Sequence, residues 1–163
     1  MKKRFLLIAA TCLFLSPCVW ADPEQARALG QLAEDLQHYS YAAQAEIEQN
    51  SYGDKIKPSE QLNSGLQQLG VYAYRVSREI AERGGPEDFQ CIFQGMAEEV
   101  DTQLNALETA KDGETQLKAY QRISSMLSDA SAVSEAAALT LEDLPKNRPQ
   151  ANPNIGTCDA VYE

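Results

Sequence analysis

The sequence predicts an all-α protein: an antiparallel four-helix bundle with an irregular, Pro/Asn-rich C-terminal tail stapled by a disulfide. Three observations predict this fold. Apolar residues recur at the three- and four-residue spacing of amphipathic helices, in four separate stretches. No stretch of useful length alternates between apolar and polar residues as a half-buried strand does. The breaks between the four stretches are short, which is typical of an up-down-up-down bundle.

The N-terminal segment, residues 1–21, is a predicted cleavable signal peptide. Met1–Arg4 is basic, Phe5–Leu15 is an apolar run, and small residues lead to Ala21. The apolar run is shorter than the roughly 20 residues that span a bilayer. Because this style of signal is typical of bacteria, we expect cleavage after Ala21 and a periplasmic or secreted chain without stable membrane insertion.

Cys18 offers an alternative fate for the signal. Residues 15–18, Leu-Ser-Pro-Cys, resemble a bacterial lipobox, in which the cysteine is lipidated and becomes the N-terminus. The resemblance covers these four residues and fails at Pro17, where the motif has a small residue. The sequence therefore favours a soluble chain over a lipoprotein attached through Cys18, and an uncleaved anchor stays open as a third possibility.

The first expected helix begins after Asp22, which can cap it, and has Pro23 in its first position. It should end near residues 50–53, where Asn, Ser, Tyr and Gly follow one another. Its predicted apolar face consists of Leu29, Leu32, Leu36, Tyr39, Ala43 and Ile47.

The second expected helix opens at residues 58–60, Pro-Ser-Glu, and ends at residues 84–86, Gly-Gly-Pro. The 4-3-4-3-4 spacing of its apolar residues predicts a seam like that of a coiled coil. These residues are Leu62, Leu66, Leu69, Ala73, Val76 and Ile80.

The third and fourth expected helices are separated by residues 111–113, Lys-Asp-Gly, and the fourth should reach about Leu141. The third is marked by Phe89, Phe93, Met96, Val100, Leu104 and Leu107. The fourth is marked by Leu117, Tyr120, Ile123, Leu127, Ala130, Val133 and Ala137. We therefore assign residues 22–144 to one helical bundle domain.

The C-terminal tail, residues 145–163, contains three prolines and is not expected to be helical. After removal of the signal, Cys91 and Cys158 are the remaining cysteines, and one disulfide is the simplest outcome in an oxidising compartment. Closing residues 92–157 into a loop stabilises the fold by about 4 kcal/mol in the chain-entropy model. The tail should pack on the bundle through Cys158, with Val161 and Tyr162 as candidate anchors.

The charge of the mature chain restricts its partners. Removing Lys2, Lys3 and Arg4 leaves 11 of the 14 basic residues against 24 acidic ones, a net charge near −13. This charge argues against nucleic acid and against anionic lipid surfaces. It favours a cationic protein as partner.

The residues that could carry chemistry are sparse. His38 is the single histidine, so a Ser-His-Asp or Cys-His site has little to build on. Asp35 and His38 weakly resemble the Glu-x-x-His motif of di-iron bundles, but the second histidine is missing, and an ion pair of His38 with Glu34 explains them better. Haem attachment lacks a Cys-x-x-Cys-His motif. We therefore expect no cofactor, no metal and no catalytic residues.

Tyr72, Tyr74, Arg75 and Arg78 form the one basic-aromatic patch of the sequence and are the candidate binding residues. Arginines directed into a bundle could bind a carboxylate bidentately. Ion pairs along the helix surface, Arg78 with Glu82 and Glu79 with Arg83, explain the charges without a ligand.

By elimination, the sequence favours an exported acidic binding protein over an enzyme. It could be an inhibitor, immunity or adaptor protein for a cationic envelope or cell-wall-acting partner. One alternative is a periplasmic chaperone or assembly factor for a secretion or surface structure, with a groove between helices. The other is a small exported helical enzyme or ligand carrier that uses Arg75 and Arg78.

Overall fold

The computed structural model describes residues 23–146 together with Cys158. Over these residues the chain forms four α-helices and no strand, so the prediction of an all-helical fold is confirmed. The helices are α1 Pro23–Gln49, α2 Glu60–Glu82, α3 Glu87–Thr109 and α4 Gly113–Asp143. The predicted signal peptide, its cleavage site, Val161 and Tyr162 lie outside the described residues. None of the described helices is long and apolar enough to cross a membrane.

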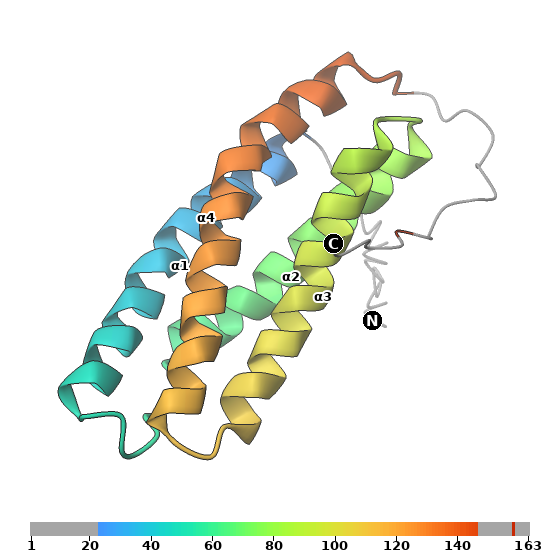
Figure 1. Cartoon of the computed structure of the whole chain (residues 1–163). Coiled ribbons are helices and arrows are strands. Elements are labelled where there is room, and N and C mark those ends of the chain that lie inside the picture. The colour runs from blue at the N-terminus through green and yellow to red at the C-terminus, as the bar shows by residue number, and fades with distance from the viewer. Residues whose placement is uncertain (1–22, 147–157, 159–163) are drawn as a thin grey trace, which may run out of the picture.

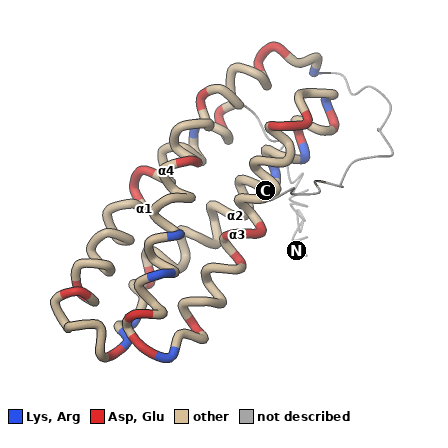
Figure 2. Tube along the Cα trace, viewed as in Figure 1, with Lys and Arg blue, Asp and Glu red and all other residues tan. Residues whose placement is uncertain are grey.

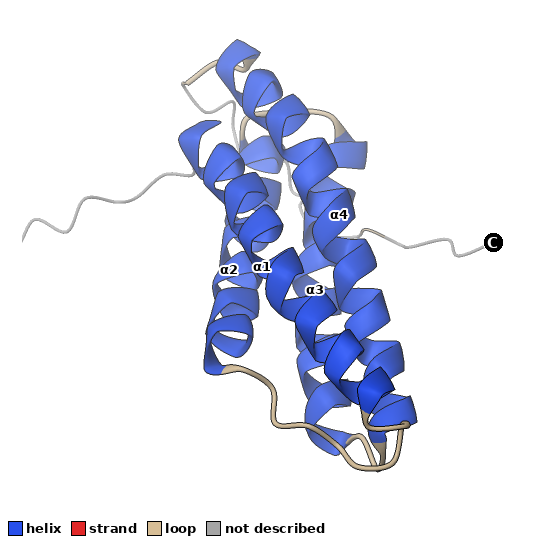
Figure 3. Cartoon of the chain, turned by 90° about the vertical axis from the view of Figure 1, so that its left-hand side faces the viewer, coloured by secondary structure: helices blue, strands red, loops and turns tan. Residues whose placement is uncertain are grey.

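The four helices are arranged as two close pairs. Helix α1 lies along α4 and α2 lies along α3, and the two pairs pack against each other over a shared core (Figures 1 and 3). Consecutive helices run in opposite directions in Figure 1. The α2–α3 turn and the end of α4 therefore lie at one end of the molecule, and the α1–α2 and α3–α4 connections lie at the other.

The helix ends follow from local capping chemistry. The Ser59 hydroxyl accepts a hydrogen bond from the Leu62 amide, and the Asp112 carboxylate accepts one from the Thr115 amide at 2.8 Å. This bond holds the pKa of Asp112 below its usual value. Gly84 ends α2 with a φ of 74°, a left-handed conformation that favours glycine. The turn residues of the sequence thus locate the helices.

The α2 seam is buried as predicted, with every member at most 1% exposed. Other predicted core positions are less deep: Tyr39 is 38% exposed, and Phe89, Leu104 and Val133 are half-buried. The interface of α1 with α4 includes small residues as well as large ones. A Cβ atom on Gly30 would lie 2.7 Å from the Cβ of Ser134, so these two helices approach each other closely.

Candidate binding surfaces

The predicted patch lies on α2, but its members differ in exposure. Tyr74 is 53% exposed and Arg75 is also exposed. Tyr72 is half-buried against the core, and its hydroxyl accepts a hydrogen bond from Gln68 Nε2 at 2.7 Å. The exposed part of the patch therefore consists of Tyr74 and the two arginines, whereas Tyr72 packs against the core.

Arg78 completes the patch through an ion pair on the surface of α2. Its Nη2 donates to Glu82 Oε1 at 2.5 Å, as the sequence predicts. Glu82, and to a lesser extent Tyr74, raise the pKa of Arg78. Because Arg78 is exposed, solvent screens this pair and its contribution to stability is small. The arginines of the patch are exposed on α2, whereas an internal ligand site would need them directed into the core.

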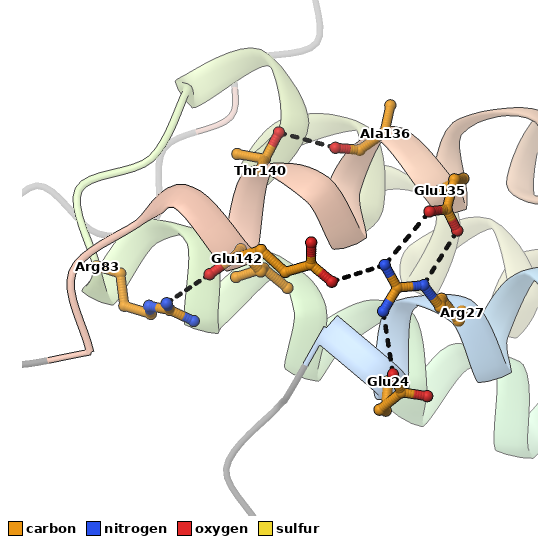
Figure 4. Close-up of polar contacts among 8 residues, drawn as sticks. Glu24, Arg27, Arg83, Glu135, Ala136, Thr140 and Glu142 are labelled. Atoms are coloured by element: carbon orange, nitrogen blue, oxygen red, sulfur yellow. Dashed lines mark hydrogen bonds and ion pairs between the residues drawn. The ribbon is translucent and has the colours of Figure 1, made fainter.

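The second expected ion pair, Arg83 with Glu79, is present, but it is buried and does not lie at the surface. Arg83 stands 3.7 Å from Glu79, and its side chain is only 6% exposed. Its Nη2 donates to the carbonyl oxygens of Leu141 at 2.5 Å and Leu144 at 2.6 Å, and its Nε to that of Pro145 at 3.3 Å. Figure 4 shows Arg83 directed toward the last turns of α4. Arg83 therefore caps the last turn of α4, where a cation is favoured by the helix dipole. The i, i+4 spacing alone did not reveal this.

Arg27 is the centre of an ion-pair network between the start of α1 and the end of α4 (Figure 4). It contacts Glu24 at 3.0 Å, Glu135 at 3.2 Å and Glu142 at 2.7 Å. Glu142 and then Glu135 raise the pKa of Arg27. The network joins two helices and engages the arginine fully, so we interpret it as structural.

His38 is exposed and does not pair with Glu34 as the sequence analysis expects. Glu34 Oε1 instead accepts a hydrogen bond from Ser131 Oγ of α4 at 2.9 Å, because α4 packs along that side of α1. The imidazole of His38 stands edge-on to the ring of Tyr39, with centroids 5.7 Å apart. Within residues 23–146 and Cys158, no three His, Cys, Asp or Glu side chains gather as metal ligands would.

The exposed carboxylates of α3 form a surface that we call the α3 acidic surface. The helix holds six carboxylates and no Lys or Arg (Figure 2). Glu99 is half-buried and pairs with Arg122 at 2.5 Å. The five exposed carboxylates, for which no ion pair is found among the described residues, are Glu87, Asp88, Glu98, Asp101 and Glu108.

Two apolar features lie among these carboxylates. Ile92 is 41% exposed. Gly95 is exposed, and no described heavy atom lies within 4 Å of the position of a Cβ added to it. Beside them, Cys91 forms a disulfide with Cys158, with Cα atoms 5.3 Å apart. The surface thus combines negative charge, an exposed aliphatic side chain and bare helix backbone.

A groove opens at the other end of α3, where the α1–α2 connection lies beside α2 and α3. Its volume is about 750 Å³. Apolar side chains of Ile56, Pro58, Leu104 and Leu107 line it together with polar groups of the connection and of α2, α3 and α4. No pattern in the sequence predicts this groove, because its residues come from the connection, α2, α3 and α4 and share no motif.

Comparison with protein-family models, with curated proteins and with solved structures found no match for this chain.

Proposed function

We propose that the chain is an exported acidic binding protein, without catalytic activity, that recognises a basic protein of the cell envelope through the α3 acidic surface. The observation that carries this proposal is the charge of α3: five exposed carboxylates without an ion pair among the described residues, and no basic residue on the same helix. Charges of one sign on an exposed face steer an oppositely charged partner and raise its association rate.

Ile92 and Gly95 are the positions on the same surface where a partner protein could pack closely against α3. Interfaces combine an apolar centre with a polar rim, and an exposed isoleucine amid carboxylates fits that pattern. Gly95 supports the argument because glycine in a helix interior costs about 1 kcal/mol relative to alanine. No packing contact among the described residues explains that cost. A partner that approaches the helix backbone would explain it.

Compartment and architecture belong to the same proposal. The mature chain would begin at Asp22, as a periplasmic or secreted antiparallel bundle of residues 22–144. The tail, residues 145–163, would be held beside the α3 acidic surface through Cys158. An inhibitor, immunity or adaptor protein for a basic cell-wall-acting partner fits this arrangement. Mass spectrometry of exported chain should give an N-terminus at Asp22, and a lipidated Cys18 would contradict the soluble assignment.

The alternative with a structural observation in its favour is a chaperone or assembly factor, because the groove beside α3 could hold part of a client. Variants distinguish the two functions: capture of a partner through the α3 acidic surface should be lost in Asp88→Asn/Glu98→Gln, whereas capture through the groove should not. The enzyme or ligand carrier built on Arg75 and Arg78 has less support, since both side chains are exposed.

The test is capture of partners from an envelope extract by the immobilised oxidised chain, at low and at moderate salt. We expect one basic protein in stoichiometric amount, with less recovered at moderate salt. The double variant Asp88→Asn/Glu98→Gln should lose most of this recovery. Ile92→Ser should weaken it at both salt concentrations, because it removes an apolar contact.

The matched control is Asp35→Asn/Glu48→Gln, which removes two exposed carboxylates from α1 and changes the net charge equally. It should retain the partner. Equal loss in both double variants would show that net charge alone attracts the protein. Recovery that does not depend on salt would contradict the proposal.

A further inference from the structure

The groove between the α1–α2 connection and α3 has a wall that is fixed in place at several points. Gln116 of α4 is buried, and its amide pairs with both backbone groups of Ile56: Nε2 donates to the carbonyl and Oε1 accepts from the amide, each at 2.9 Å. The Gly113 amide donates to the Gly53 carbonyl at 3.5 Å. The connection is therefore held against the start of α4.

The same connection contains backbone strain. Ser51 and Tyr52 have φ values of 54° and 62°, in the left-handed region that side chains other than glycine disfavour. Such strain persists where the surroundings over-determine the conformation, and it is often found at binding sites. Here it turns the chain so that residues 55–58 form one wall of the groove.

The polar side chains that line the groove are mostly free to bind a ligand. The ammonium groups of Lys55 and Lys57 have no ion pair among the described residues, in a chain whose formal net charge is −10. The side-chain amides of Asn63 and Gln67, one turn apart on α2, and of Asn105 on α3 have no hydrogen bond among those residues either. Glu108 is the one carboxylate in the lining.

We propose that this groove binds a short extended peptide that carries a carboxylate. The two lysines would bind the carboxylate, since charge-assisted hydrogen bonds to oxygen are strong. The amides of Asn63, Gln67 and Asn105 both donate and accept, which matches the alternating donors and acceptors of a peptide backbone. Leu104 and Leu107 would contact an aliphatic side chain of the peptide.

The lining disfavours other classes of anion. It contains no aromatic ring on which a nucleobase or a sugar could stack, and no arginine to hold a phosphate bidentately. The groove shares only Glu108 with the α3 acidic surface and lies at the other end of α3 from Ile92 and Gly95. The proposal therefore does not rest on the proposed recognition of a basic protein.

The experiment is an NMR titration of the ¹⁵N-labelled oxidised chain with three acetylated tetrapeptides. The first, Gly-Val-Ala-Leu, has a free terminal carboxylate; the second, Asp-Val-Asp-Leu, is amidated at its terminus; the third, Asn-Val-Asn-Leu, is amidated and neutral. We expect the side-chain amide signals of Asn63, Gln67 and Asn105 to shift with a carboxylate peptide and not with the neutral one. The first two peptides distinguish a terminal carboxylate from side-chain carboxylates.

The variant Lys55→Gln/Lys57→Gln should weaken binding about tenfold, the effect of losing one to two charge-assisted contacts. The control Lys111→Gln/Lys146→Gln removes two exposed lysines outside the groove and should bind as the wild type does. Equal binding of the neutral peptide, equal loss in both variants, or no shift of the three amides would each overturn the proposal. Capture of a basic partner by the α3 acidic surface is expected to be unchanged in Lys55→Gln/Lys57→Gln, so the two proposals can fail separately.

Discussion

At the scale of single residues, Tyr120 places a polar group without a hydrogen-bond partner in the core of the described residues. It is the largest fully buried side chain of the described residues, and its hydroxyl has no hydrogen-bond partner among them. An unsatisfied buried hydroxyl costs about 1–3 kcal/mol. We therefore expect Tyr120→Phe to raise the free energy of unfolding by about 1 kcal/mol, measured by urea denaturation at pH 7. A loss of stability would show that the hydroxyl has a partner after all.

The pH dependence of Tyr120 offers an independent check. Burial, and then the charge of Glu46, raises the pKa of Tyr120 to about 12. The unfolded chain ionises this group near pH 10, so it binds fewer protons than the folded chain between these values. Stability should therefore fall as the pH rises above about 10, and this part of the loss should be absent in Tyr120→Phe. Urea midpoints of the two chains from pH 8 to pH 11 test the sign.

Among the arginines, Arg83 should contribute most to the free energy of unfolding. Arg83→Met would leave the carbonyls of Leu141 and Leu144 without their charged donor in a buried place. We expect a loss of about 3 kcal/mol in the free energy of unfolding. Arg78→Met, which removes an exposed ion pair of the same helix, should cost less than about 1 kcal/mol. Similar losses in both variants would contradict the capping role of Arg83.

At the scale of helices, Gly30 lies where α1 packs closely against α4, whereas Gly95 lies on an open face of α3. In Gly30→Ala the new Cβ would lie 2.7 Å from Ser134 Cβ at the close approach of α1 and α4. The overlap should outweigh the helix propensity of alanine and destabilise the fold by about 1–2 kcal/mol. Gly95→Ala meets nothing within 4 Å and should stabilise it by about 1 kcal/mol. Thermal unfolding measures both, and the same sign for both would contradict this packing.

Helix positions could be predicted from the sequence because local chemistry determines them. Ser59 and Asp112 cap helices, and Gly84 ends one, at the places where turn residues interrupt the apolar spacing. The α1–α4 interface was harder to predict, since Gly30 and Ser134 are small and one of them is polar. The spacing of large apolar residues reveals the seam of α2. It does not reveal the α1–α4 interface, where small residues let the two helix backbones approach each other closely.

The candidate sites could be predicted less well than the helices, because they depend on contacts between residues that are far apart in the sequence. The groove depends on Gln116 bonding to Ile56, 60 residues apart in the chain, and spacing along the sequence does not encode that contact. The acidic character of α3 is visible in the sequence as carboxylates without basic neighbours. The exposure of Ile92 cannot be read from the sequence, because it depends on where α4 lies.

At the scale of the whole molecule, the Cys91–Cys158 disulfide cross-links α3 to the C-terminal segment, across a sequence separation of 67. In the chain-entropy model, a loop of this length contributes about 4 kcal/mol, mainly by restricting the unfolded chain. Helices α1 to α4 have their own core, so reduction should leave the helical circular-dichroism signal nearly unchanged in water. The urea midpoint should fall substantially.

The double variant Cys91→Ser/Cys158→Ser should reproduce the reduced chain, and reductant should not lower its midpoint further. This control separates the loss of the link from other effects of reductant. If the tail also covers part of the α3 acidic surface, the reduced chain should exchange the backbone amides of residues 92–99 faster with solvent. An unchanged urea midpoint on reduction would mean that the tail contributes nothing to stability. The disulfide would then matter only for what it holds beside α3.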